Sequence, residues 1–317
     1  MSGPDPSDRV SPTLSQPLDP SLAVVDVKVS DVKARVAEEI RLQRSERWTV
    51  LRRNPAFLVG ALITAFWLIC ALFGSTLAPK DPAVLDPLNK LKGPSAAHWF
   101  GTDLLGRDVF SRVIVGARVI LFIALGATIL GTVLGTTMGL VAGYFKGIAD
   151  DVLMRIADAL TAMPVIVFAV LAVAALKRAS NVAVLLVIGI VFTPIIARTV
   201  RATVLGEAEL EYVAAARLRT EKTPHILFVE LLPNVLPPVI VEFTVRLGYA
   251  IFAVATLSFL GVGVTPESPD WGTQVADHYG FVNGVNWTAA FFPAAAIATL
   301  AVGVNLLADG LLEAFER

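Results

Sequence analysis

The sequence predicts an all-α membrane protein with six transmembrane helices. Of its 317 residues, 55% are hydrophobic and only 17% are charged, and the mean hydropathy is +0.69. The charged residues cluster between long apolar blocks, whereas the amphipathic elements of a soluble protein would spread them along the chain. This pattern indicates helices that cross a lipid bilayer.

Six apolar segments are long enough to span, because a helix needs about 20 apolar residues to cross a bilayer. Their approximate ranges are 56–78, 113–144, 153–176, 181–200, 235–262 and 288–308. Only residues 177–180 separate the third span from the fourth, so these two should form a tight helical hairpin.

The region before the first span divides into two parts. Residues 1–29 are rich in Pro, Ser and Asp, which predicts a disordered cytoplasmic tail. In residues 30–54, Val32, Val36 and Ile40 recur every four residues, which favours an amphipathic helix on the membrane surface or, alternatively, a solvated helix. Residues 55–317 form the transmembrane domain, with a cytoplasmic loop at 201–234.

The distribution of Lys and Arg predicts the orientation. The loop from about 264 to 287 has neither residue, which places it outside the cell. Both termini and the 201–234 loop are then cytoplasmic. The basic residues on the cytoplasmic side are Arg41, Arg44, Arg47, Arg52, Arg53, Arg198, Arg201, Arg217, Arg219 and Lys222.

Composition excludes some kinds of site. The only cysteine is Cys70, so no intrachain disulfide forms. His98, His225 and His278 are far apart and make no recognisable zinc spacing. The net charge of −1 gives no information about a partner, and no nucleic-acid partner is expected. The chain also lacks a G-x-x-x-x-G-K-[ST] loop, so it does not cradle nucleotide phosphates in that manner.

Two groups within the spans are candidate sites. Small residues spaced by four favour close helix packing, with pore lining as the alternative. They are Gly131, Gly135, Gly139 and Gly143. Glu242 and Arg246 have the i, i+4 spacing of an ion pair and either neutralise each other or line a translocation path.

The 201–234 loop predicts two short helices. Residues 207–219 are rich in helix-favouring residues, and Tyr212, Ala215, Ala216 and Arg219 share one face that another protein can approach closely. Thr223 and Pro224 begin a second helix as its cap and first residue. Pro233 should end it.

Four stretches together resemble the second permease subunit of bacterial dipeptide, oligopeptide and nickel ABC importers. The 201–234 loop is similar to the family's coupling loop, except that Thr220 stands at the usual glycine position. The other three are HWFGTDLLGRDVFSRVIVGARV at 98–119, LSFLGVGVTPESPDWG at 257–272 and NLLADGLLEAFER at 305–317. The resemblance covers about residues 50–317.

The resemblance implies a type I ABC importer permease (MetI-like) fold in the bacterial inner membrane. It implies a homologous second permease subunit, two cytosolic ATPase subunits that bind ATP and Mg²⁺, and an extracytoplasmic solute-binding protein, with no cofactor on this chain. The alternative is a secondary transporter or channel without ATPase partners; a membrane-embedded enzyme lacks a supporting motif.

The resemblance also assigns candidate contacts. Residues expected to couple to an ATPase subunit are Glu211, Tyr212, Ala215, Ala216, Arg217, Arg219, Thr220 and Pro233. Residues expected to meet the binding protein are Asp103, Arg107, Asp108 and Trp271. The first three of these alternatively brace one another.

Overall fold

The computed structural model describes residues 51–176, 180–263, 268–282, 284 and 287–316, and within them the chain forms helices and loops without a β-strand. The predicted tail and nearly all of the predicted interfacial helix lie outside the described residues. So do residues 177–179 of the predicted hairpin connection.

Five helices are long and apolar enough to cross a membrane. They are α2 (Pro55–Leu77), α3 (Val109–Phe145), α6 (Asn181–Glu207), α9 (Leu232–Phe259, continuous with the residues from Thr223 on) and α11 (Thr288–Glu316). Helices α2 and α3 begin at side-chain caps: the Asn54 side chain accepts a 3.1 Å hydrogen bond from Phe57 N–H, and Asp108 accepts one of 2.9 Å from Ser111 N–H.

The third predicted span is not one straight helix. It is a pair, α4 (Gly147–Thr161) and α5 (Val165–Ala175), whose axes meet at 87°. Pro164 stands at the junction; it lacks an N–H and disfavours helical geometry at Met163. Counted together, the pair gives a sixth candidate span.

Pro233 does not end a helix, contrary to the prediction. Helix α8 (Thr223–His225) passes into a π-helical turn, η2 (Ile226–Leu231), and this passes directly into α9. The Leu232 N–H donates to the Leu227 carbonyl, five residues back, which is the π pattern. The Asn234 side chain donates 2.8 Å to the Glu230 carbonyl. The proline falls in the first turn of α9, where a missing N–H is tolerated.

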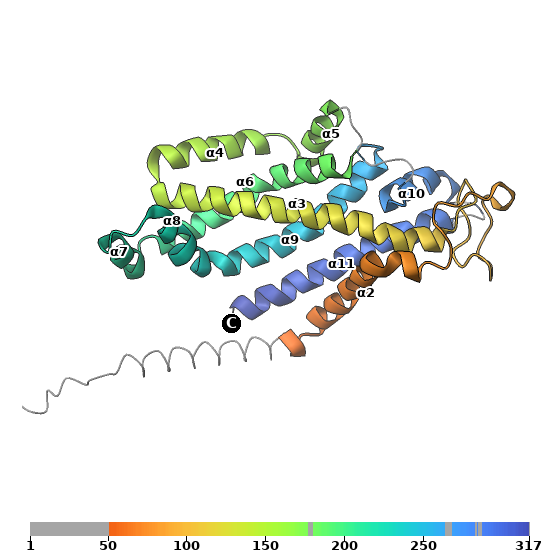
Figure 1. Ribbon diagram of the computed structural model, residues 1–317, viewed down its shortest axis with the longest axis horizontal. Helices are drawn as coiled ribbons and strands as arrows, with labels where there is room; N and C mark the ends of the chain where they lie inside the picture. The colour runs from red at the N-terminus through yellow and green to blue at the C-terminus, as the bar shows by residue number, and fades with distance from the viewer. Residues whose placement is uncertain (1–50, 177–179, 264–267, 283, 285–286, 317) are drawn as a thin grey trace, which may run out of the picture. The chain divides into compact units, whose positions relative to one another are not determined.

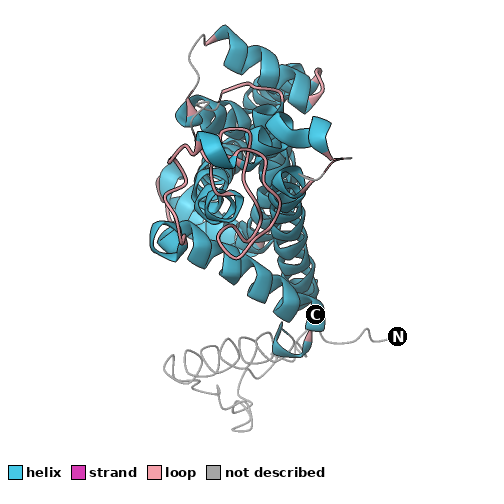
Figure 2. Cartoon of the chain, turned by 90° about the vertical axis from the view of Figure 1, so that its right-hand side faces the viewer, coloured by secondary structure: helices cyan, strands magenta, loops and turns pink. Residues whose placement is uncertain are grey.

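Helices α3, α6 and α9 run side by side, and α2 and α11 pack together along α3 and α9 (Figure 1). Helices α7 (Glu211–Leu218) and α8 lie at one end of these long helices. At the other end are α10 (Trp271–His278), the 3₁₀ turns η1 (Pro87–Asn89) and η3 (Tyr279–Phe281), and the long α2–α3 connection. Figure 2 looks onto this loop-rich end. We call the two ends the α7 end and the α10 end.

The four glycines spaced along α3 lie directly against α6. A Cβ atom at Gly135 would lie 2.7 Å from the Ile196 Cβ, and one at Gly139 would lie 2.7 Å from the Val200 Cβ. Gly131 and Gly143 meet α6 in the same way. Real Cβ atoms do not approach so closely, so only glycine allows these two backbones their present separation.

Candidate functional site

Helix α7 and its flanking turns form a small unit at the α7 end, which we call the α7 unit (residues 208–231). Val213 and Ala216 are fully buried within the chain, and Tyr212 and Ala215 are half-buried. Glu211 and Arg217 are exposed, and Leu218 is 85% exposed. Ala216, one of the expected ATPase-coupling residues, therefore packs inward. Leu218, which was not among them, faces outward.

Thr220 adopts the left-handed backbone conformation, with φ of +56°. The Thr220 N–H donates to the Arg217 carbonyl at 2.9 Å, and the Glu221 N–H donates to the Ala216 carbonyl at 3.2 Å. These two bonds form a Schellman motif, which normally has glycine at this position. The backbone path therefore has the form that glycine favours, although a β-branched residue occupies it.

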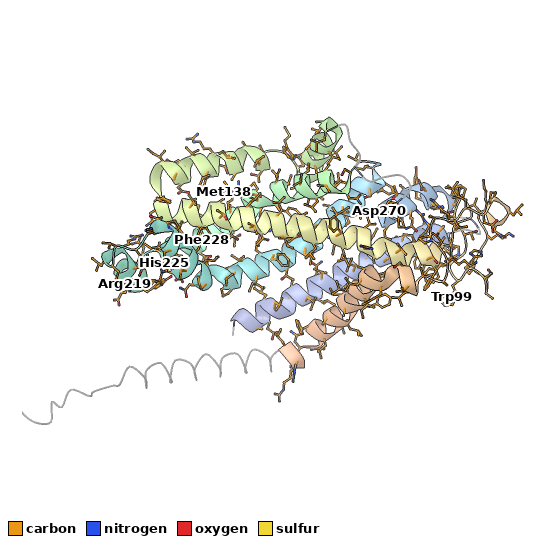
Figure 3. The ribbon with its side chains drawn as sticks, viewed as in Figure 1. Trp99, Met138, Arg219, His225, Phe228 and Asp270 are labelled. Carbon is orange, nitrogen blue, oxygen red and sulfur yellow. The ribbon has the colours of Figure 1, made fainter. Side chains whose placement is uncertain are left out.

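Arg219 ties the two halves of the α7 unit together. Its guanidinium donates to Glu221 at 2.7 Å and to Glu230 at 3.3 Å, and the His225 ring lies 3.4 Å from Glu221. Figure 3 labels Arg219, His225 and Phe228 at this end. Glu221, His225 and Glu230 offer atoms within 4.8 Å of one another that could hold a metal ion. Because Arg219 already donates to one oxygen of each carboxylate, a metal ion would have to displace it, and we assign no metal there.

Three further contacts attach the α7 unit to the long helices. The Tyr212 hydroxyl donates to Glu207 at 2.8 Å, and burial together with this bond raises the pKa of Tyr212 to about 12. Arg217 lies 4.9 Å from the ring centre of Tyr144 at the end of α3. Lys146 pairs with Glu209 and lowers the pKa of that carboxyl. The unit is thus held to both α3 and α6.

Glu242 and Arg246 form an ion pair inside α9. The Arg246 Nη2 and Nε lie 2.7 and 2.8 Å from the Glu242 Oε1. The Arg246 guanidinium also lies 5.2 Å from the ring centre of Tyr249. The structure brings this sequence-predicted pair together but does not bring it near the α7 unit.

Helix α4 is attached to α6 by pairs that local spacing did not indicate. Asp150 pairs with Arg201, and Asp158 accepts a 2.7 Å bond from Arg198. Both partners are more than 35 residues distant along the chain, which is why sequence spacing missed them.

The four expected binding-protein contacts face inward at the α10 end. Asp103 pairs with Arg107 at 2.6 Å, and Asp108 pairs with His98 at 2.9 Å. The Trp271 indole donates to the Val113 carbonyl at 2.8 Å. All four side chains are buried, so a partner meeting this end of the isolated chain would touch other residues.

Three buried residues at the α10 end were not anticipated. Arg112 donates to the carbonyls of Pro82 and Ser268, each at 3.2 Å, and so joins two loops. His278 accepts from the Leu104 N–H at 3.2 Å. Asp270 caps α10 through the Thr273 N–H at 3.0 Å, and burial raises its pKa. Arg112 directly precedes the second predicted span, and Asp270 is of a residue type that favours a helix N-cap, so these two carried a local signal, whereas His278 carried none.

Two family models match the sequence of this chain. Residues 135–317 match the family described as binding-protein-dependent transport system inner membrane component. Residues 43–94 match the N-terminal transmembrane domain of oligopeptide transport permease C.

Several curated proteins are similar over most of their length. A dipeptide transport system permease of Alkalihalophilus pseudofirmus is 38% identical over 86% of this chain and 88% of its own. A probable D,D-dipeptide transport system permease of Escherichia coli K12 is 35% identical over 87% and 92%. A glutathione transport system permease of Escherichia coli O6:K15:H31 is 37% identical over 88% and 92%. The chain is therefore a multi-pass inner-membrane permease that belongs to the binding-protein-dependent transport system inner membrane component family.

Proposed function

We propose that this chain is half of the translocation path of an ATP-driven importer of di- or oligopeptides. The observation that carries the proposal is its similarity, over nearly the whole chain, to permeases named for dipeptide and glutathione transport. This similarity does not favour a secondary transporter or channel. The proposed partners are a homologous second permease subunit, two cytosolic ATPase subunits that bind ATP and Mg²⁺, and an extracytoplasmic solute-binding protein.

In this proposal the α7 end faces the cytoplasm, together with both termini. The Lys and Arg distribution supports this orientation. The α7 unit then meets an ATPase subunit. Its outward side carries Glu211, Arg217 and Leu218, an apolar residue between charged ones. An exposed leucine flanked by polar groups suits the centre of a protein–protein contact.

The α7 unit is also built to pass on movement. Its contacts with Tyr144 and Lys146 reach α3, its contact with Glu207 reaches α6, and its second half continues into α9. A displacement applied to the unit therefore acts on three long helices together, as rigid-body motion. Closure of the ATPase pair on ATP would in this way rearrange the membrane helices.

The test compares two exposed leucines. Leu218→Glu places a charge on the proposed contact, and Leu88→Glu, at a residue 88% exposed in η1 at the α10 end, is the matched control. Each variant is produced with the complete complex. We expect Leu218→Glu to reduce copurification of the ATPase subunits and dipeptide uptake by at least about tenfold, which corresponds to about 1.4 kcal/mol. The control should retain the ATPase subunits.

Two results would contradict the proposal. Full retention of the ATPase subunits by Leu218→Glu would remove the docking assignment. Absence of dipeptide uptake by the wild-type complex in proteoliposomes, with binding protein and ATP present, would remove the cargo assignment. Ala216→Glu is unsuitable as the test because Ala216 is fully buried in this chain, so the change acts on folding first.

A further inference from the structure

The Glu242–Arg246 pair lies near the middle of a membrane-spanning helix. At 1.5 Å per residue, Arg246 is about 20 Å from either end of α9. An isolated charge at this depth costs several kcal/mol, so such residues face protein or water and mark functional paths. The pair therefore requires protein or water, and not lipid, next to this face of α9.

The rest of the chain covers most of this face but leaves part of it open. The side chains of Glu242 and Arg246 retain 13% and 17% of their exposure. Tyr249, one turn further along, is 58% exposed and lies beside the Arg246 guanidinium. The i, i+4 and i+7 spacing puts all three residues on one side of the helix. Contact of this side with lipid would be unfavourable for the charges, so protein or water covers it; in the proposed complex that cover is the path shared with the second permease subunit.

The chemistry of the pair favours one class of passenger. Glu242 and Arg246 neutralise each other at rest, so the face carries no net charge. A zwitterionic solute can pair with both residues and leave no charge unpaired. Its ammonium group pairs with the Glu242 carboxylate, and its own carboxylate pairs with the Arg246 guanidinium, which binds carboxylates in a bidentate manner. A solute of single charge leaves one member of the pair unpaired and pays a desolvation penalty.

The dimensions agree with a short peptide. Residues four apart are about 6 Å apart along a helix, and two extended residues span about 7 Å. The Tyr249 ring offers an apolar surface to a peptide side chain. We infer that Glu242, Arg246 and Tyr249 form a transient site that receives the ammonium and carboxylate termini of a zwitterionic peptide during its passage. This inference rests on the proposed function.

The experiment removes both charges together. Glu242→Gln combined with Arg246→Met leaves no unpaired charge, so a purely structural pair should tolerate it. The matched control is Asp158→Asn with Arg198→Met, which neutralises the exposed α4–α6 pair. Uptake of Ala-Phe and of N-acetyl-Ala-Phe-amide is measured in proteoliposomes with the complete complex, each peptide at a concentration that saturates the binding protein.

We expect the wild type and the control to import Ala-Phe at least about tenfold faster than the blocked peptide. In the doubly neutral α9 variant, Ala-Phe uptake should fall to the rate of the blocked peptide, while binding-protein-stimulated ATP hydrolysis continues. If the α9 variant imports Ala-Phe as fast as the wild type does, the inference is wrong and the proposed function still stands. Loss of stimulated ATP hydrolysis assigns the pair to structure and also overturns it. Failure of the wild type to import either peptide overturns both proposals.

Discussion

The backbone N–H of Glu221 donates a 3.2 Å hydrogen bond to the carbonyl oxygen of Ala216 and closes helix α7. The bond forms because Thr220, between them, is left-handed, with φ of +56°. This turn sends the chain back beneath α7, so that Arg219 reaches Glu230. One unusual backbone angle thus determines the compactness of the α7 unit.

Thr220→Gly should stabilise the protein. A left-handed conformation costs a non-glycine residue about 1–2 kcal/mol, and glycine avoids this cost but loses more entropy on folding. The expected net gain is about 0.5–1 kcal/mol, seen as a higher midpoint of thermal unfolding in detergent. Thr223→Gly, at a helical position of α8, is the matched control and should destabilise by roughly 0.3 kcal/mol. If both variants lower the midpoint of thermal unfolding equally, Thr220 is not strained by its left-handed conformation.

The glycine contacts between α3 and α6 give a second prediction. A Cβ at Gly139 would lie 2.7 Å from the Ala197 carbonyl oxygen as well as from Val200. Gly139→Ala should therefore force the helices apart and cost about 1–3 kcal/mol. Gly206→Ala on α6 has open space around its added Cβ and should be neutral or stabilising by up to about 1 kcal/mol. Chemical denaturation in micelles can compare the unfolding free energies of the two variants. Similar values would show that the α3–α6 contact at Gly139 tolerates an added methyl group.

Much of the fold follows from local sequence signals. Apolar length alone located α2, α3, α6, α9 and α11, because a bilayer requires about 20 apolar residues. Asn54 before Pro55 marks a helix start by cap and first residue. Pro164 also carried its signal, since a proline inside an apolar run predicts a break.

Other features depend on tertiary context. The π turn at 226–231 has no sequence period of its own, so Pro233 was interpreted as a helix end. The Asp150–Arg201 pair joins residues 51 apart in sequence, beyond any local spacing rule. In the α7 unit, sequence indicated a helical loop with small residues, but only packing decides that Ala216 is inside and Leu218 outside.

Trp271 gives a third prediction, at the α10 end. It is fully buried, donates to the Val113 carbonyl and packs edge-on against Trp67 with ring centres 4.8 Å apart. Trp271→Phe removes the hydrogen bond and leaves a small cavity, so we expect a loss of about 1–3 kcal/mol in unfolding free energy. Trp99→Phe, at a ring 60% exposed, should change stability by less than about 0.5 kcal/mol. An unaffected Trp271→Phe variant would show that this hydrogen bond and the indole packing contribute little to stability.

Asp270 gives the last prediction, a dependence of stability on pH. Burial raises the pKa of this carboxyl in the folded protein, so the folded state binds its proton more tightly than the unfolded state does. Protonated Asp270 therefore contributes to the stability of the folded protein. This contribution is fully present below the pKa of the unfolded state, about 3.9, and is lost as the pH rises through the pKa of the folded state. Stability of the wild type should therefore fall over this window.

Asp270→Asn should remove that fall. Asparagine caps helices about as well as aspartate and can still accept from the Thr273 N–H, and it is uncharged at every pH. The variant should match the wild type at the acid end and exceed it near pH 8, as measured by thermal unfolding in detergent at several pH values. The opposite result, a variant less stable at every pH, would mean that the protein needs the Asp270 negative charge, which acts on the buried guanidinium of Arg112. In that case the buried carboxylate stabilises the positive charge of Arg112, which donates to the Pro82 and Ser268 carbonyls and so holds two loops together.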